Sequence, residues 1–370
     1  KMELDAYVGI GVDIYAQVFV PGSTPGPGPA PDIQAWIGYS TSNTNPNLWP
    51  EVQWKVADIN NFQAHLIENN DEYMIQEFGE DLPLGTYYVA SRFQKGAGAY
   101  VYGGTEDTTD NVSGGIWGTG PYKSLKININ KTIAWVPNAG ATAGEWNNTT
   151  GPVIKSPVII ATDITSPTNS FSAKNITINN GVGLTIPSGN YVKVQDNIIN
   201  NNAGNDKLVI QNDANLIQVN EIDTNSGIGG ATVKRNASVP DIQYNYWSSP
   251  VASQDLYGFY DAGAPSANTV MTYNTSNDYF NVVSSGTFEK GRGYSIKGSS
   301  SGPSNATFEG KLHNGEFSKT LATTGQKYNL VGNPYPSNIN LSTLYNDNTS
   351  NIESTVYFWD YTNNTVMNQV

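Results

Sequence analysis

Carboxylate side chains recur in a short stretch of the N-terminal third, and paired carboxylates are the acid and base of glycoside hydrolysis. Asp71 and Glu72 are adjacent, and Glu77, Glu80 and Asp81 follow them. A hydrolase needs two such groups roughly 5 to 10 Å apart in a cleft. These acids stand at expected strand ends and turns, where charged side chains are common because they remain in contact with water. The pattern therefore favours surface acids, and it assigns no catalytic residue.

A second group of acids crowds one loop. Glu106, Asp107 and Asp110 offer the hard oxygen ligands that Ca²⁺ prefers. Their spacing lacks the order of a calcium-binding loop, so a solvated acidic turn is favoured and calcium stays a candidate. The sequence indicates no other cofactor.

Histidine and cysteine chemistry is sparse. The chain has two histidines, His65 and His313, and no cysteine. The lack of cysteine excludes disulfides, thiolate metal sites and cysteine nucleophiles. Neither histidine belongs to a metal-binding pattern, so both are expected at the surface. The glycines Gly103 and Gly104 lead into no helix, which argues against a nucleotide site.

Aromatic side chains are the remaining candidates for ligand contact. Trp36, Tyr39, Trp49 and Trp54 lie within 19 residues. Exposed rings of this kind can stack on sugar faces. Trp36 is in the middle of an expected strand and is predicted to be core, whereas Trp49 stands in a proline-flanked loop and is predicted to be the most exposed ring. Trp49, Trp54 and Tyr39 are therefore the candidate ligand residues.

The composition narrows the class of protein. The 370 residues include 32 acids and 19 bases, a formal net charge of −13, which argues against nucleic acid as a partner. No apolar run reaches the roughly 18 residues of a membrane span. The 37 glycines, 20 prolines and 22 tyrosines are typical of many short strands joined by turns. An all-β fold is therefore predicted.

Residues 1–130 alternate strongly between apolar and polar positions. This pattern predicts a β-sandwich of two antiparallel sheets, similar to immunoglobulin or starch-binding domains. The expected strands are Val12–Val20, Ile33–Tyr39, Val52–Val56, Glu72–Phe78, Gly85–Phe93 and Lys123–Ile129.

Residues 131–240 carry shorter strands separated by Asn and Gly corners. Most place two apolar residues two positions apart, which predicts coils of a β-solenoid with inward aliphatic ladders. A further sandwich is the alternative, and the short strands favour the solenoid. The residues predicted to point inward are Ile178, Leu184, Ile186, Val192, Val194, Leu208 and Ile210.

Residues 241–370 are aromatic and again rich in strands, which predicts a second β-sandwich, with Trp247 in its core. The strand Thr355–Trp359 leads to a turn at Asn363 and Asn364, and only six residues follow that turn. We therefore expect the strand to lack a partner, the sandwich to be incomplete, and the native chain to continue beyond Val370.

Four motifs in this last segment resemble a known module. It precedes the sorting domain in proteins that Bacteroidetes export through the type IX secretion system. The motifs are Tyr246-Trp247-Ser248-Ser249-Pro250-Val251, Gly291-Arg292-Gly293-Tyr294, Phe308-Glu309-Gly310-Lys311-Leu312-His313-Asn314-Gly315 and Leu330-Val331-Gly332-Asn333-Pro334-Tyr335-Pro336-Ser337. The first segment is similar to another module of such proteins, through Ala35-Trp36-Ile37-Gly38-Tyr39 and Gly85-Thr86-Tyr87-Tyr88-Val89.

The resemblance implies export across the outer membrane and an extracellular or cell-surface location. It implies the type IX translocon and its outer-membrane shuttle as partners, with a sorting domain following in the full chain. By the same resemblance, Asp107-Thr108-Thr109 matches the pattern of O-glycosylation, with Thr108 as acceptor.

These observations favour a non-enzymatic part of a secreted cell-surface protein, either an adhesin or an adhesin stalk. An external surface or a glycan would then be its ligand. Two alternatives remain open. One is a glycan-binding accessory region of a polysaccharide-degrading enzyme, and the other is an extracellular hydrolase or nuclease.

Overall fold

The protein is built almost entirely of β-strands. The computed structural model describes residues 3–26, 28–60, 71–106, 114–138, 144–165, 169–221, 225–237, 239–360 and 364–369. Its one described α-helix is α1 (Leu341–Asn346). No helix in these ranges combines the length and the apolar character that a membrane crossing requires. The predicted all-β class is confirmed.

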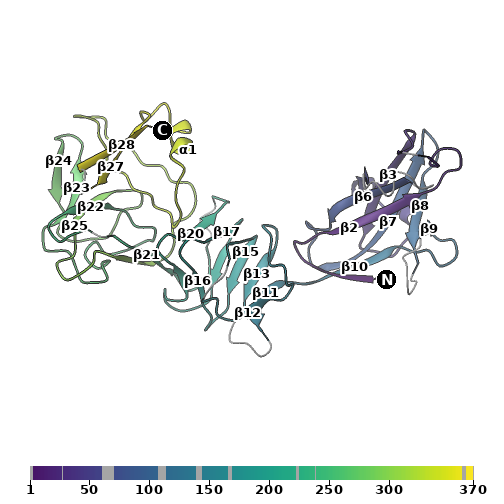
Figure 1. Ribbon diagram of the computed structural model, residues 1–370, viewed down its shortest axis with the longest axis horizontal. Coiled ribbons are helices and arrows are strands. Elements are labelled where there is room, and N and C mark those ends of the chain that lie inside the picture. The colour runs from purple at the N-terminus through teal and green to yellow at the C-terminus, as the bar shows by residue number, and fades with distance from the viewer. Residues whose placement is uncertain are drawn as a thin grey trace. The chain divides into compact units, whose positions relative to one another are not determined.

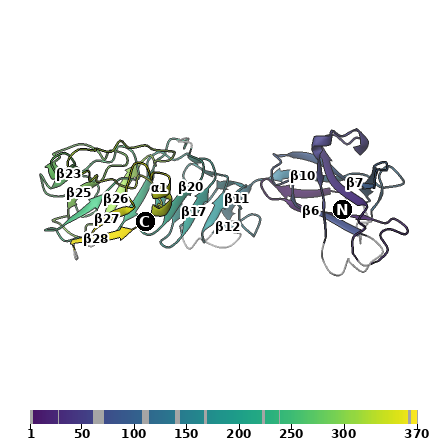
Figure 2. The same ribbon diagram turned by 90° about the horizontal axis from the view of Figure 1, so that it is seen from above.

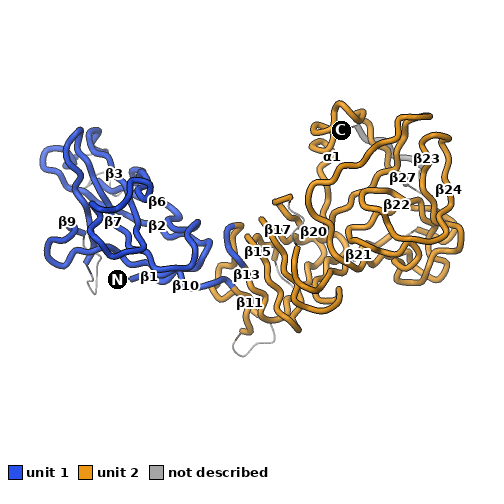
Figure 3. The backbone as a smooth tube through the Cα atoms, turned by 180° about the vertical axis from the view of Figure 1, so that it is seen from behind, with its two compact units in different colours: residues 1–133, 155–157 blue, residues 134–154, 158–370 orange. Residues whose placement is uncertain are grey.

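The chain divides into two compact units (Figures 1 and 3). Unit 1 contains residues 1–133 and 155–157, and unit 2 contains residues 134–154 and 158–370. The segments expected to form the solenoid and the C-terminal sandwich thus fall largely within one unit.

Unit 1 is a sandwich of two sheets. The larger sheet has the order β1 (Glu3–Tyr7), β10 (Leu125–Lys131), β7 (Gly85–Lys95), β3 (Ile33–Ser40) and β4 (Trp54–Val56), with β8 (Val101–Thr105) and β9 (Gly114–Ile116) continuing from β7. The smaller sheet has the order β2 (Val12–Val18), β6 (Asp71–Phe78) and β5 (Asp58–Ile59). Every pair is antiparallel except β1 with β10, which is parallel and departs from the predicted pattern.

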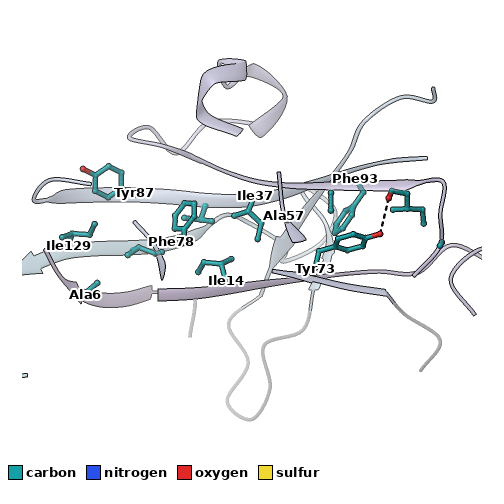
Figure 4. Packing of buried hydrophobic residues seen from close by; sticks show 14 residues of the cluster. Ala6, Ile14, Ile37, Ala57, Tyr73, Phe78, Tyr87, Phe93 and Ile129 are labelled. Carbon is teal, nitrogen blue, oxygen red and sulfur yellow. Dashed lines mark hydrogen bonds between the residues drawn. The ribbon is translucent and has the colours of Figure 1, made fainter. Parts of the chain in front are cut away.

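Buried residues from both sheets form the core of unit 1 (Figure 4). Ile37, Phe78 and Ile129 lie within it. The hydroxyl group of Tyr73 donates to the backbone oxygen of Ile33 at 3.3 Å, the contact dashed in Figure 4. Burial, together with two nearby aspartates, raises the pKa of Tyr73 to about 12. The hydroxyl therefore stays protonated and keeps donating.

Residues 157–235 wind as a three-sided β-solenoid (Figures 1 and 2). The first side contains β13 (Pro157–Ile160), β15 (Asn175–Ile178) and β18 (Ile198–Asn200), the second contains β16 (Leu184–Ile186), β19 (Leu208–Ile210) and β21 (Ala231–Arg235), and the third contains β14 (Phe171–Ala173), β17 (Tyr191–Val194) and β20 (Asn215–Gln218). Pairing along the second and third sides, and of β15 with β18, is parallel. Parallel neighbours need a crossover connection, and here the other two sides supply it.

The inward ladders confirm the predicted solenoid. Residues of successive coils stack in pairs: Ile176 with Ile198, Leu184 with Leu208 and Val192 with Leu216. All seven residues predicted to point inward are between 0 and 3% exposed. The alternative of a further sandwich is wrong, because such a fold would pair these strands in antiparallel fashion.

An aromatic hairpin covers the first coil. It consists of β11 (Ile133–Pro137) and β12 (Gly144–Trp146), which are antiparallel. The ring of Trp146 contacts Trp135 at 5.1 Å and Phe171 at 5.2 Å between centroids. A solenoid needs such an atypical end because the open edge of a coil would otherwise expose apolar surface.

The C-terminal segment covers the last coil and shares a sheet with it. Four strands form one antiparallel sheet in the order β22 (Tyr244–Trp247), β25 (Tyr294–Lys297), β23 (Val270–Asn274) and β24 (Tyr279–Val282). The strand β26 (Ala306–Gly310) instead pairs with β21 of the solenoid. The segment is therefore not a free-standing sandwich, because one of its strands completes a solenoid sheet.

An aromatic core joins these two layers. Trp247 of β22 lies 5.6 Å from Phe259 and 6.1 Å from Phe308 of β26 between ring centroids. Trp247 is 8% exposed, which confirms its predicted core position. Val331 makes only an isolated bridge with Arg292, and residues 326–331 form no regular strand.

The strand β27 (Thr355–Asp360) does have a partner. Residues after the turn form β28 (Asn364–Gln369), which pairs with it antiparallel along its whole length. The expectation of a missing partner is thus wrong, because the few residues that follow the turn suffice for a hairpin. The indole nitrogen of Trp359 donates to the backbone oxygen of Tyr244 at 2.8 Å and ties the hairpin to β22. Asn363 lies outside the described residues.

Candidate functional site

The tryptophans expected to bind a ligand lie on the outer face of the larger sheet of unit 1. Two single-turn 3-10 helices, Pro46–Leu48 and Glu51–Gln53, carry the chain over this face. Trp49, Trp54 and Ala90 are buried there, and three further rings pack against them. Gly38 leaves the space that the Trp54 ring occupies, because a Cβ atom at position 38 would lie 2.5 Å from that ring.

The prediction that Trp49 is exposed is wrong, because its ring is 6% exposed. It stacks on Trp54 at 5.5 Å between centroids, and its indole nitrogen donates to Thr44 Oγ1 at 3.3 Å. The prediction that Trp36 belongs to the sandwich core is also wrong. Its neighbours Ala35 and Ile37 face that core, so alternation turns Trp36 to the outer cluster.

Arg92 is the centre of this outer cluster and is only 2% exposed. Its guanidinium carbon lies 4.8 Å from the Trp36 ring, 4.7 Å from Trp54 and 4.2 Å from Tyr100. Both terminal nitrogens donate to the carboxylate of Glu51, one of them at 2.7 Å. That hydrogen bond from Arg92 holds the pKa of the Glu51 carboxyl below its ordinary value. The ring faces are thus occupied by the guanidinium and by one another.

Tyr39 lies apart from the two tryptophans. Its ring contacts Phe78 at 6.0 Å and Tyr87 at 5.9 Å, both in the sandwich core. Tyr39 and Trp54 therefore occupy opposite faces of the larger sheet. The structure does not bring the three candidate ligand residues together.

The acids of the N-terminal third take structural roles. Asp71 accepts from the Ala30 N–H at 2.8 Å, and Glu72 accepts from Gln17 Nε2 at 2.9 Å. Lys155 pairs with Glu80 at 2.6 Å and with Asp81 at 3.0 Å. These carboxylates hold loops and strands of the sandwich in place.

Most of the candidate calcium and glycosylation residues cannot be placed. Glu106 is partly exposed at the end of β8, whereas Asp107, Thr108 and Asp110 lie outside the described residues, as does His65. Within the described ranges, no three His, Asp or Glu residues lie close enough together to hold a metal ion.

A pocket in unit 2 lies where the solenoid meets two loops. The edge strand β20 and the residues that follow it form one wall, and the loops at 313–315 and 335–337 form the other. Its volume is about 190 Å³. Leu216 and Val219 supply apolar surface, whereas Glu221 and His313 supply a carboxylate and an imidazole. We regard this pocket as the candidate functional site.

The local sequence explains the second loop. The side chain of Asn333 accepts from the Tyr335 N–H at 2.9 Å and donates to the Ser337 oxygen at 2.6 Å. Prolines at 334 and 336 restrict the backbone between these contacts. The Pro336 oxygen in turn accepts from the Leu216 N–H at 3.2 Å. The loop therefore caps the exposed edge of β20.

Tyr335 joins the two loops of the pocket. Its hydroxyl group donates to the Gly315 oxygen at 2.7 Å. Burial, together with the nearby carboxylates of Glu221 and Glu316, raises the pKa of Tyr335 above its ordinary value. The phenol consequently stays neutral, and the pocket has a negative electrostatic character.

The four motifs of the C-terminal segment contact one another. Bridges join Val251 to Leu312 and Arg292 to Val331, and Tyr335 contacts Gly315. The turn at 291–294 requires glycine, because Gly291 has φ +71° and a Cβ atom would lie 2.1 Å from Phe317. The motifs thus build the layer that holds the pocket.

The sequence alone did not indicate this pocket. The wall formed by the two loops belongs to the motifs quoted above, but the other wall is β20, whose residues indicated only a solenoid strand. Asn314-Gly315 and Pro334-Tyr335-Pro336 are residue types that favour loops, but such local signals do not indicate that the two loops meet.

Comparison with known proteins places the chain in a family. Residues 135–370 match the model of a domain of unknown function, DUF8693. The comparison with curated proteins found no match. The comparison with solved structures found none either. The match spans the solenoid, its aromatic ends and the pocket, and the chain belongs to the DUF8693 family.

Proposed function

We propose that this chain is a non-enzymatic part of an exported cell-surface protein, either an adhesin or the stalk that carries one. The observation that carries the proposal is the role of the four motifs. Each contributes packing or backbone contacts to the layer that ends the solenoid. Such a capped solenoid is a rigid support on which a binding surface can be presented.

The resemblance of these motifs to modules of type IX cargo supports the location. Under this proposal the protein crosses the outer membrane with the translocon and its shuttle as partners, and it works outside the cell. The negative net charge of −13 is compatible with a solvated extracellular protein.

Protease treatment of intact cells tests the location. The native protein, followed with an antibody against residues 1–370, should be degraded on intact cells while a cytoplasmic marker survives. It should also be lost from the surface when the type IX translocon is inactivated. A protein that resists protease until the cells are lysed would contradict the proposal.

A glycan-binding accessory region of a polysaccharide-degrading enzyme is the second candidate. The pocket favours it, because apolar and polar groups converge there next to Tyr335. Retention of the purified chain on one insoluble polysaccharide would support this candidate. An open reading frame with no catalytic domain beside this chain would favour the adhesin.

A further inference from the structure

We propose that the pocket between β20 and the loops at 313–315 and 335–337 binds one pyranose ring of an uncharged or amino-bearing sugar. This inference rests on the proposed function, because it names the ligand class of an adhesive surface. It concerns unit 2, whereas the sequence placed glycan contact on the tryptophans of unit 1.

The apolar side of the pocket suits the C–H face of a sugar ring. Tyr335 lines it with an aromatic ring that its hydrogen bond to Gly315 holds in place. Leu216 and Pro336 are buried beside it. An aromatic side chain that is already held in place loses little conformational entropy when a ligand binds. Even a small contact area can therefore contribute to the affinity. The volume of about 190 Å³ limits the ligand to roughly one sugar ring.

The polar side of the pocket suits hydroxyl groups. Glu221 lines the pocket and is exposed. A carboxylate accepts up to four hydrogen bonds and can therefore take two neighbouring hydroxyl groups, or one ammonium group. The imidazole of His313 lies in the same lining. Glu221 belongs to the wall formed by β20 and the residues that follow it, and His313 belongs to the wall formed by the two loops.

The charge of the pocket selects among sugars. The carboxylates of Glu221 and Glu316 both raise the pKa of Tyr335, and among the described residues the lining includes no lysine or arginine. An anionic sugar would bring a third negative charge into this region, which disfavours uronic acids and sulfated glycans. The ammonium group of an amino sugar would instead be attracted by these carboxylates.

A lysine side chain of a partner protein is the competing ligand, since it also combines an apolar stem with a positive charge. The pocket favours the sugar because its lining combines the apolar residues Leu216, Val219 and Pro336 and the aromatic Tyr335 with polar residues. A sugar ring presents C–H groups on one face and hydroxyl groups at its rim, so it can contact both the apolar and the polar residues of the pocket.

Titration of residues 1–370 with single sugars tests the inference. The probes are methyl glycosides of glucose, galactose, mannose, N-acetylglucosamine and glucosamine, with methyl glucuronide as the anionic comparison and a lysine tetramer as the peptide. Binding is followed by NMR and calorimetry. We expect at least one neutral or amino sugar to bind about tenfold more tightly than the glucuronide and the peptide.

Glu221→Gln and a matched control locate the site. Glu221 is exposed, so its substitution should leave the fold intact. Loss of a charged hydrogen-bond acceptor should weaken sugar binding about tenfold or more. Glu309→Gln changes an exposed glutamate of β26 outside the lining and should leave the affinity unchanged.

Three results would overturn the inference: no binding of any sugar probe, equal affinity in the Glu221 variant and the wild type, or preference for the lysine tetramer. None of these results bears on the surface location, which the protease experiment decides separately. Failure of the sugar-binding inference can therefore be distinguished from failure of the adhesin proposal.

Discussion

Arg92 lies buried against the larger sheet of unit 1 with both terminal guanidinium nitrogens bonded to the carboxylate of Glu51, a residue of the covering loop. This ion pair joins β7 to the second 3-10 helix. It also places a guanidinium among three aromatic rings, where a cation without a counter-charge would be costly to bury. The ion pair thus helps to hold the loop over Trp49 and Trp54.

Replacing Glu51 by Gln should make the stability of unit 1 less sensitive to acid. The folded-state pKa of Glu51 is lowered from its ordinary value of 4.5, so its carboxylate stabilises the fold fully above that value. This contribution is lost as the pH falls through the lowered pKa. The melting temperature of the wild type should therefore exceed that of Glu51→Gln at neutral pH, and the difference should vanish in acid.

Glu145→Gln is the control for this titration, since it changes an exposed glutamate of β12 in the other unit. It should lower the melting temperature little at any pH. A wild-type advantage over Glu51→Gln that persists unchanged into strong acid would contradict the assigned role of the ion pair.

Shortening Val194 to Ala should destabilise the solenoid by about 1–3 kcal/mol, because it removes buried methyl groups and leaves a cavity. Val194 is fully buried and pairs with Ala173 and Gln218 of the neighbouring coils. Urea unfolding should show a lower midpoint with an unchanged slope. The neighbouring Lys193→Ala, at an exposed position, should change the free energy of unfolding by less than about 0.5 kcal/mol. Equal effects of the two changes would disprove the inward ladder.

Asn200 should tolerate neither Ala nor Asp. Its side-chain nitrogen donates to the Gly230 oxygen at 2.8 Å, and its side-chain oxygen accepts from the side chain of Asn202 at 2.9 Å. Ala removes the donor to the Gly230 oxygen and the acceptor of the Asn202 backbone N–H, which donates to Asn200 Oδ1 at 3.1 Å, and each loss costs about 1–3 kcal/mol. Asp keeps the shape but cannot donate to Gly230. Denaturant titrations of both variants measure the loss, and a fully stable Asp variant would show that the donated bond contributes nothing.

The hydrogen bond between Trp247 and Tyr260 should give a measurable coupling free energy in a double-mutant cycle. The indole nitrogen of Trp247 donates to the Tyr260 hydroxyl at 2.9 Å, and both residues are buried. Trp247→Phe leaves that hydroxyl without its donor, whereas adding Tyr260→Phe removes both polar groups. The double variant should lose about 1 kcal/mol less than the sum of the single losses. Additive losses would mean that the two residues merely pack together.

The sequence by itself determined the class of fold and the faces of most strands. Period-two alternation predicted the ladder residues Leu184 and Val194 as buried, and both are. The motif around Trp247 indicated a core residue because a large ring stood on a strand among small neighbours. Such features are local, since one face of a strand must be apolar to be buried, whatever the strand packs against.

Only the tertiary structure decided which faces are covered and which loops meet. Trp49 follows the pattern of an exposed loop residue, yet the contact of Glu51 in its loop with Arg92, 41 positions later, holds that loop over the sheet. The strand β26 looked like part of a second sandwich but joined β21. The pocket unites Leu216, His313 and Tyr335, which are far apart in the chain. Pairing between distant segments depends on the summed burial and hydrogen bonding of whole layers, and no local pattern encodes that sum.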